Sequence, residues 1–108
     1  MGKGGYVRDI QQEIKKDIET HPIILFMKGS KDLPLCGFSA QVVDILSRWT
    51  PEFETRDVLQ DEVLREGIKA YSSWPTLPQL YIQGKFIGGC DIVMQLDSEG
   101  KLQELLGG

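Results

Sequence analysis

The sequence lacks the paired cysteines that build zinc sites and dithiol redox centres. It holds only two cysteines in 108 residues, Cys36 and Cys90, and no Cys-x-x-Cys motif. Zinc sites made from such pairs are therefore excluded. Two cysteines are also too few for a disulfide scaffold, so we expect a reducing compartment in which the thiols are functional. We predict a cytoplasmic protein, with a mature form in the mitochondrial matrix or a plastid as the alternative.

An excess of positive charge and a long apolar run are also absent. The 12 basic and 16 acidic residues give a net charge of −4, whereas a general nucleic-acid-binding protein would be basic. No apolar run approaches the ~20 residues that cross a bilayer, and no signal-peptide pattern is visible. We therefore expect neither a nucleic-acid partner nor a membrane partner. The single histidine, His21, has no evident catalytic partner, and we interpret it as a helix-end residue.

The overall composition is ordinary for a folded domain. Hydrophobic residues make up 41% of the chain and charged residues 26%, which is the usual globular balance. A chain of this length suits one domain around one core, and it contains no repeats or low-complexity tracts. The glycine-rich start, 1–5, is predicted to be a flexible leader, and the folded domain is predicted over 6–108.

Hydrophobic periodicity predicts an alternation of helices and strands. Apolar residues at helical spacing, Val7, Ile10, Ile14 and Ile18, predict a first helix that ends before Pro22. The apolar run 23–27 predicts a strand buried on both faces, and a helix follows from Cys36 to about Trp49. The later elements are expected in the order strand 53–58, helix 61–71, strands 80–82 and 86–87, and short helices 91–96 and 101–106.

The connections between these elements predict how the sheet is built. Strand, helix and strand in succession form a right-handed parallel crossover, whereas the last two strands are close enough for an antiparallel hairpin. In the helix over 61–71 we expect Val63, Leu64, Ile68 and Tyr71 to face inward. The sequence therefore predicts an α/β fold with a four-stranded mixed sheet flanked by helices.

The segment from Lys28 to Ser39 joins the buried strand to the next helix and places Cys36 where that helix begins. A helix N-terminus offers free N–H groups and a positive dipole end, and Lys28 adds a cation. Both favour the thiolate, so we predict a reactive or metal-binding thiol. The alternative is a buried cysteine packed as a small apolar group.

The residue three positions after Cys36 is Ser39, whose hydroxyl cannot form a disulfide. A dithiol site resolves a mixed disulfide with its own second cysteine. Here a mixed disulfide on Cys36 must be resolved by Cys90 or by an external thiol.

Three short blocks carry a family resemblance. The segments 36–39 (Cys-Gly-Phe-Ser), 74–78 (Trp-Pro-Thr-Leu-Pro) and 88–91 (Gly-Gly-Cys-Asp) resemble, in order, the signatures of the monothiol, CGFS-type glutaredoxins. The resemblance covers the chain from about Ile14 to Leu106. It implies a single-domain protein with the thioredoxin-like glutaredoxin fold and a cis peptide bond before Pro78.

The resemblance also implies a glutathione site. Glutathione would pair as an added strand with the backbone at Leu77, and the Asp91 carboxylate would accept its ammonium group. A helix N-terminus would receive its γ-glutamyl carboxylate, and cationic side chains its glycine carboxylate. The alternatives are an ordinary proline loop, an N-cap role for Asp91 and solvated surface cations. The family's glutathione contacts correspond to Lys28, Cys36, Phe38, Arg65, Lys69, Thr76, Leu77, Cys90 and Asp91.

Two functions follow from the resemblance. The first is a carrier of a [2Fe–2S] cluster, which needs four ligands, usually thiolates. We predict that Cys36 is the catalytic residue and the metal ligand. Cys36 and the sulfur of one glutathione supply two ligands per chain, so a homodimer bridged by the cluster supplies all four. The resemblance implies cluster storage and transfer, iron homeostasis, and complexes with BolA-type proteins and iron–sulfur recipient proteins. The second function is that of a glutathione-dependent thiol–disulfide oxidoreductase. The resemblance implies that monothiol members of the family catalyse this reaction only weakly. A third, weaker hypothesis is a protein that serves only as an interaction module.

Overall fold

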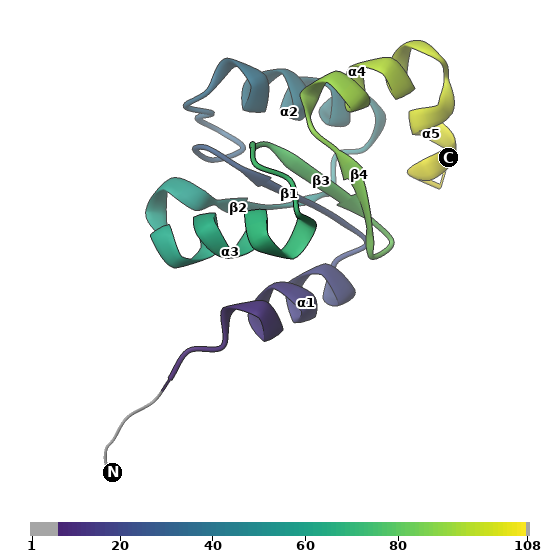
Figure 1. The fold of residues 1–108 in the computed structure, drawn as a ribbon. Helices are drawn as coiled ribbons and strands as arrows, with labels where there is room; N and C mark the ends of the chain where they lie inside the picture. Colours follow the sequence, from purple (N-terminus) through teal and green to yellow (C-terminus); the bar gives the residue numbers. More distant parts are fainter. Residues whose placement is uncertain (1–6, 108) are drawn as a thin grey trace.

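The fold is a four-stranded sheet with helices on both faces, seen in a computed structural model that describes residues 7–107 (Figure 1). The predicted leader at 1–5 lies outside the described residues. No helix within 7–107 is long and apolar enough to cross a membrane. The elements are α1 (Ile10–Thr20), β1 (Ile23–Met27), α2 (Gly37–Trp49), β2 (Glu54–Asp57), a 3₁₀ turn (Val58–Gln60), α3 (Glu62–Ser72), β3 (Gln79–Ile82), β4 (Lys85–Gly88), α4 (Cys90–Ser98) and α5 (Lys101–Leu105).

The sheet has the strand order β2-β1-β3-β4. Strand β1 pairs parallel with β2 and antiparallel with β3, and β3 pairs antiparallel with β4. The mixed four-stranded sheet predicted from the connections is therefore confirmed. Helices α2 and α4 cover one face of the sheet, and α1 and α3 cover the other (Figure 1).

Strand β1 divides the core into two clusters because its side chains alternate between the faces of the sheet. Leu25 and Met27 pack with the residues of α2, α4 and α5, whereas Ile24 and Phe26 pack with α1 and α3. All four are fully buried, and each such burial contributes about 1.5–3 kcal/mol. Burial on both faces is the reason why this strand is an unbroken apolar run.

Helix α1 begins later than its apolar pattern suggested. Asp9 is its N-cap and accepts a hydrogen bond from the Gln12 N–H at 3.2 Å. Val7, predicted to lie on the buried face, precedes the cap and is 85% exposed. The capping aspartate, which competes well for a helix start, decided this boundary.

Helix α3 buries a narrower face than predicted. Leu64 and Ile68 are buried, but Val63 and Tyr71 are exposed, so their inward assignment was wrong. Gly67 lies on the buried face, where a Cβ atom would come within 2.7 Å of the Ile10 side chain. The missing side chain lets α1 approach α3 closely, and this approach sets which residues of α3 face inward.

The boundaries of β2 and α3 are set by two aspartates. Asp57 accepts hydrogen bonds from the N–H groups of Leu59 and Gly29, both at 2.9 Å, and the strand turns into the 3₁₀ segment there. The strand is therefore shorter than the predicted 53–58. Asp61, predicted as the first helical residue, is instead the N-cap of α3.

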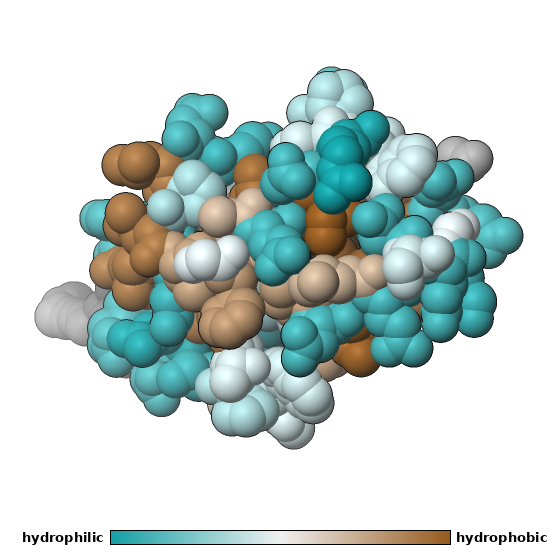
Figure 2. All heavy atoms as spheres, turned by 90° about the horizontal axis from the view of Figure 1, so that it is seen from above, coloured by the Kyte–Doolittle hydropathy of each residue, from teal (hydrophilic) through white to brown (hydrophobic). Residues whose placement is uncertain are grey.

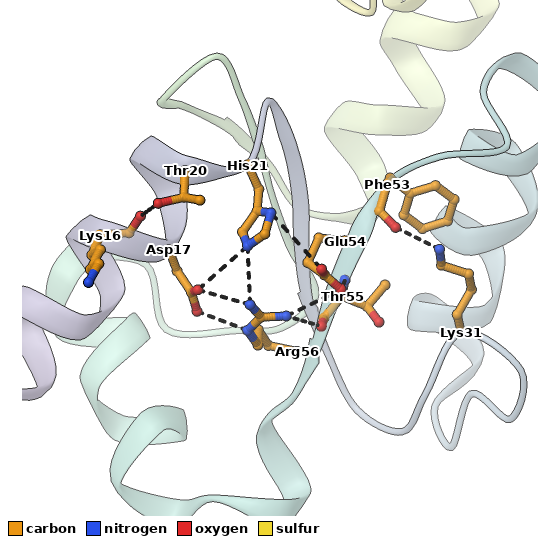
Figure 3. Close-up of polar contacts among 9 residues, drawn as sticks. All are labelled: Lys16, Asp17, Thr20, His21, Lys31, Phe53, Glu54, Thr55 and Arg56. Atoms are coloured by element: carbon orange, nitrogen blue, oxygen red, sulfur yellow. Dashed lines mark hydrogen bonds and ion pairs between the residues drawn. The ribbon is translucent and has the colours of Figure 1, made fainter.

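The edge strand β2 is tied to the end of α1 by a cluster of charged side chains, the Arg56 cluster, made of Asp17, His21, Glu54 and Arg56 (Figure 3). The Arg56 guanidinium donates twice to the Asp17 carboxylate, both at 2.9 Å, and once to the Thr55 carbonyl at 2.9 Å. His21 lies just after α1, as expected, with its Nε2 atom 3.3 Å from Arg56 Nη2. The pKa of Arg56 is raised because Asp17 holds the charged form.

The outward side of this edge strand is also bonded to charged groups. Glu54 accepts from the Thr55 N–H at 3.2 Å, and Lys31 donates to the Phe53 carbonyl at 2.6 Å (Figure 3). Edge strands in natural proteins are commonly protected by charged side chains in this way. Charged side chains thus hydrogen-bond to the backbone at Phe53 and Thr55.

Candidate functional site

One pocket of about 490 Å³ gathers all nine residues predicted for the glutathione site. The segment after β1, the start of α2, helix α3, the loop before β3 and the start of α4 each contribute to its wall. Five further residues line the pocket that were not predicted, although all belong to or adjoin the blocks 74–78 and 88–91. They are Trp74, Pro75, Pro78, Gly89 and Ile92.

Cys36 lies at the entrance to α2, as its N-cap residue. The neutral thiol makes no capping hydrogen bond, but the surroundings of the sulfur lower the pKa of Cys36. The largest cause is the Ser39 N–H, followed by the N–H of Phe38 and the charge of Lys28, while partial burial acts in the opposite direction. Cys36 thus lies at the helix N-terminus, as predicted, and this position accounts for the direction of its pKa shift.

Ser39 replaces the second cysteine of a dithiol motif, and it also has a structural role. It is fully buried, and its hydroxyl oxygen accepts a hydrogen bond from the Lys28 N–H at 3.2 Å. This bond ties the end of β1 to the first turn of α2. It holds the segment that carries Cys36 at both ends.

Cys90 also lies at the start of a helix and lines the pocket, but it differs from Cys36 in burial and in the direction of its pKa shift. It is the first residue of α4 and is buried. Its sulfur lies 3.6 Å from Gln41 Oε1 and 3.7 Å from Met94 Sδ. Burial, and then the nearby Asp91 and Cys36, raise the pKa of Cys90. Cys90 is therefore a protonated thiol at neutral pH, and both cysteines are free.

The start of α4 corrects the capping assignment of Asp91. Gly89 is the N-cap residue, and no side-chain capping bond forms there. Asp91 lies in the first turn, exposed at the pocket wall. Within residues 7–107 its carboxylate has no hydrogen bond or ion pair. A Cβ atom at Gly89 would come within 3.2 Å of the Pro78 carbonyl oxygen, so the glycine permits this close approach.

Helix α3 contributes cations to the pocket wall. Arg65 and Lys69, one turn apart, both line the pocket, and Lys28 adds a third cation from the end of β1. The Nε atom of Arg65 is buried and has no hydrogen-bond partner among the described residues. The Nη1 atom of the same arginine forms an ion pair with Glu62 Oε2, at 3.9 Å. A buried donor left unpaired costs free energy, so this arginine favours an acceptor that enters the pocket.

The loop before β3 forms the floor between these walls. The peptide bond between Leu77 and Pro78 is cis, as the resemblance implied. The side chains of Leu77 and Pro78 are buried, whereas Trp74, Pro75 and Thr76 are exposed. The site thus combines an acidic thiol, a carboxylate and three cations around one loop.

Among the described residues, no cluster of three or more histidine, cysteine or acidic side chains is placed to hold a metal ion.

Comparison with known proteins gives consistent sequence matches. A family model described as Glutaredoxin matches residues 23–87. The chain is 52% identical over 105 residues to monothiol glutaredoxin-S7, chloroplastic, of Oryza sativa subsp. japonica, covering 97% of this chain and 62% of the relative. It is 50% identical over 97 residues to the probable monothiol glutaredoxin 2 of Rickettsia typhi, covering 90% and 84%. The chain thus spans less than two thirds of the chloroplastic relative.

Solved structures agree with these sequence matches. The solution structure of reduced poplar apo GrxS14 is 49% identical, with a TM-score of 0.79, and covers 91% of this chain and 90% of that one. The crystal structure of a buckwheat glutaredoxin–glutathione complex is 25% identical, with a TM-score of 0.81 and coverages of 91% and 87%. The mixed sheet is therefore the thioredoxin-like sheet of the glutaredoxins. This chain belongs to the glutaredoxin family, among the monothiol glutaredoxins.

Proposed function

We propose that this protein binds glutathione in the pocket and, together with it, holds a [2Fe–2S] cluster between two protomers for storage and transfer. The observation that carries the proposal is the acidic, accessible Cys36 thiol in a pocket with a carboxylate on one wall and cations on another. The role in iron homeostasis, the BolA-type partners and the recipient proteins belong to the same proposal.

The charges of the pocket support glutathione as the ligand. Its γ-glutamyl end carries an ammonium group, which suits the Asp91 carboxylate, a group without a hydrogen bond or ion pair within residues 7–107. Its glycine end carries a carboxylate, which would satisfy the buried Arg65 Nε together with Lys28 or Lys69. A charged hydrogen bond to an otherwise orphaned donor is worth about 1.5–3 kcal/mol. The related buckwheat structure contains glutathione, which supports the same ligand class here.

The ligand count supports a cluster shared between two chains. Cys36 is accessible, whereas Cys90 is buried, so one chain offers one ready thiolate. A bound glutathione adds a second, and two protomers supply four. The neighbours of Cys36, Leu35 and Phe38, are exposed large hydrophobic residues. Hydrophobic side chains gather at one end of the face formed by α2 and α4 (Figure 2), and such a surface suits contact with another protein.

Anaerobic reconstitution with iron, sulfide and glutathione tests the proposal. We expect a red-brown dimer that absorbs visible light, and a colourless apoprotein that elutes as a monomer in size-exclusion chromatography. The dimer should lose its colour and dissociate when glutathione is removed. A cluster retained on a monomer without any thiol cofactor would contradict the proposal.

The second candidate is a glutathione-dependent oxidoreductase, favoured by the lowered pKa of Cys36. The Cys36 thiolate would attack the glutathione sulfur of a protein–glutathione mixed disulfide and release the protein thiolate. A second glutathione thiolate would then attack the Cys36–glutathione disulfide, free Cys36 and leave as oxidised glutathione. We expect only weak turnover, because Ser39 leaves no internal resolving thiol in the motif. Turnover comparable to that of a dithiol glutaredoxin would make this the principal function.

The compartment is part of the proposal. The rice relative is named as chloroplastic, which supports a plastid form as an alternative to the cytoplasm.

A further inference from the structure

A buried amide lies directly beneath the loop that forms the pocket floor. Gln79 follows the cis proline and begins β3, and it is one of only two buried polar side chains described. Its Nε2 atom donates to the carbonyls of Trp74 and Thr76, both at 3.2 Å. Burial of an amide is costly unless its hydrogen bonds are made, and here both donors are used on the loop.

The orientation of this amide is set from the hydrophobic core. The Tyr81 hydroxyl donates to Gln79 Oε1 at 3.1 Å, which leaves the amide nitrogen to face the loop. The Tyr81 ring is 1% exposed and packs against Phe26 and Phe86, with centroid distances of 5.7 and 5.3 Å. Burial raises the pKa of Tyr81, so the hydroxyl keeps the proton that it donates.

The loop is also held by packing, since the Trp74 ring lies 6.0 Å from the Phe86 ring and the Leu77 side chain is buried. Its start is fixed to the end of α3, because the Trp74 N–H donates to the Lys69 carbonyl and to Ser72 Oγ. Its end is fixed by the strand pairing of β3. Between these points Trp74, Pro75 and Thr76 are exposed and line the pocket. Among the described residues, the two bonds from Gln79 are the only hydrogen bonds that side chains donate to the carbonyls of this loop, which would pair with glutathione.

We propose that Gln79 is a positioning residue for glutathione, which holds the backbone of the Trp74–Leu77 loop in the conformation that receives the tripeptide, with Tyr81 acting through it. This inference rests on the proposed function. Gln79 touches neither the pocket surface nor Cys36, since it is fully buried and does not line the pocket. Its effect is transmitted through the two loop carbonyls.

Two variants of nearly unchanged volume test the inference. Gln79→Met removes both donors and the acceptor, whereas Tyr81→Phe removes only the hydroxyl that orients the amide. Isothermal titration with reduced glutathione should show about a five- to tenfold higher Kd for Gln79→Met. Tyr81→Phe should give a smaller increase of about two- to threefold. The double variant should match Gln79→Met, because Tyr81 acts only through Gln79.

A control separates positioning from general destabilisation. Leu102→Ala removes a buried side chain of α5 from the core cluster on the opposite face of the sheet from Tyr81, and should lower the melting temperature without changing the Kd for glutathione. In the apoprotein, amide hydrogen exchange at Trp74, whose N–H is hydrogen-bonded at the start of the loop, should accelerate in Gln79→Met while β1 keeps its protection. This exchange measurement needs no glutathione, so it tests the support of the loop separately.

The outcomes are distinguishable. If the wild-type protein does not bind glutathione, the proposed function is wrong and the inference is wrong with it. If the wild type binds and Gln79→Met binds equally well, the proposed function stands and the inference is wrong. A Kd increase in Leu102→Ala that matches its loss of stability would also overturn the inference, because affinity would then follow global stability.

Discussion

The Arg56 cluster and the pocket use the same kinds of side chain in opposite ways. In the cluster, all three guanidinium nitrogens of Arg56 have partners, from Asp17, Thr55 and Glu54. In the pocket, Arg65 has a buried nitrogen without a partner among the described residues. The first arginine satisfies its hydrogen bonds within the fold, and the second lacks an acceptor. Satisfied charges indicate a structural role, whereas an unsatisfied buried donor in a pocket indicates a ligand.

The two cysteines repeat this contrast within the pocket. Cys36 is accessible, and its surroundings favour the thiolate. Cys90 is buried against Gln41 and Met94, and its surroundings favour the thiol. The two cysteines thus differ in chemistry because Cys36 is partly exposed and Cys90 is buried.

The largest expected effect comes from Cys36→Ser, which should abolish cluster assembly while the fold survives. The sulfur is accessible, so its replacement leaves no large cavity. Visible absorbance after reconstitution and circular dichroism of the apoprotein measure the two parts. The matched control is Cys90→Ser, which should reduce assembly far less. A cluster of normal intensity on Cys36→Ser would show that Cys36 is not the ligand.

The next effect in size is that of Asp91→Asn, which should impair cluster assembly at low glutathione. Losing the partner of the ligand's ammonium group should cost about 1–3 kcal/mol, and this cost enters once per protomer. Because Gly89 and not Asp91 is the N-cap, the melting temperature of the apoprotein should change little. Raising the glutathione concentration should restore assembly in Asp91→Asn but not in Cys36→Ser. Normal assembly at low glutathione would refute the placement of the γ-glutamyl group.

A crossed pair of variants tests the comparison of the two arginines directly. Arg65→Met should raise the Kd for glutathione about tenfold, the equivalent of about 1.4 kcal/mol, and leave the melting temperature unchanged or slightly higher. Arg56→Met should lower the free energy of unfolding by about 1–2 kcal/mol and leave the Kd unchanged. Titration calorimetry and thermal melting of both proteins give the four values. If both variants lose affinity in proportion to stability, the distinction between the two sites is wrong.

The smallest expected effect concerns pH and the two thiols. Because the pKa of Cys36 is lowered and that of Cys90 is raised, the alkylation rate of Cys36 should rise with pH through a lower midpoint than that of Cys90. The lowered pKa also means that the Cys36 thiolate stabilises the fold above the unfolded-state pKa. That contribution is lost as pH falls through the folded-state pKa. Lys28→Gln should move the Cys36 midpoint slightly upward, because the charge of Lys28 ranks behind the N–H groups as a cause.

Rates of iodoacetamide alkylation in the two single-cysteine variants measure these midpoints. Equal midpoints for Cys36 and Cys90 would contradict the contrast between the thiols.

Local patterns were enough to predict the order of the elements and the place of Cys36. The apolar run 23–27 is buried on both faces, so its pattern is unambiguous. Cys36 lies between a polar loop and a periodic segment, so its position at the start of a helix follows from neighbours in the sequence. The family blocks added most residues of the pocket wall, because each block is short and contiguous, whereas the cations Lys28, Arg65 and Lys69 lie outside the blocks and came from the family's glutathione contacts.

Only the tertiary structure decided how individual side chains are satisfied or left unsatisfied. Gln41, which belongs to α2, contacts the sulfur of Cys90 in α4. Asp17 of α1 accepts hydrogen bonds from Arg56 of β2, and the Tyr81 hydroxyl in the core orients the Gln79 amide. Val63 and Tyr71 are exposed because the close approach of α1 at Gly67 sets the buried face of α3. Periodicity reports which face of an element is apolar, whereas burial and hydrogen bonding depend on partners brought together from distant segments by packing.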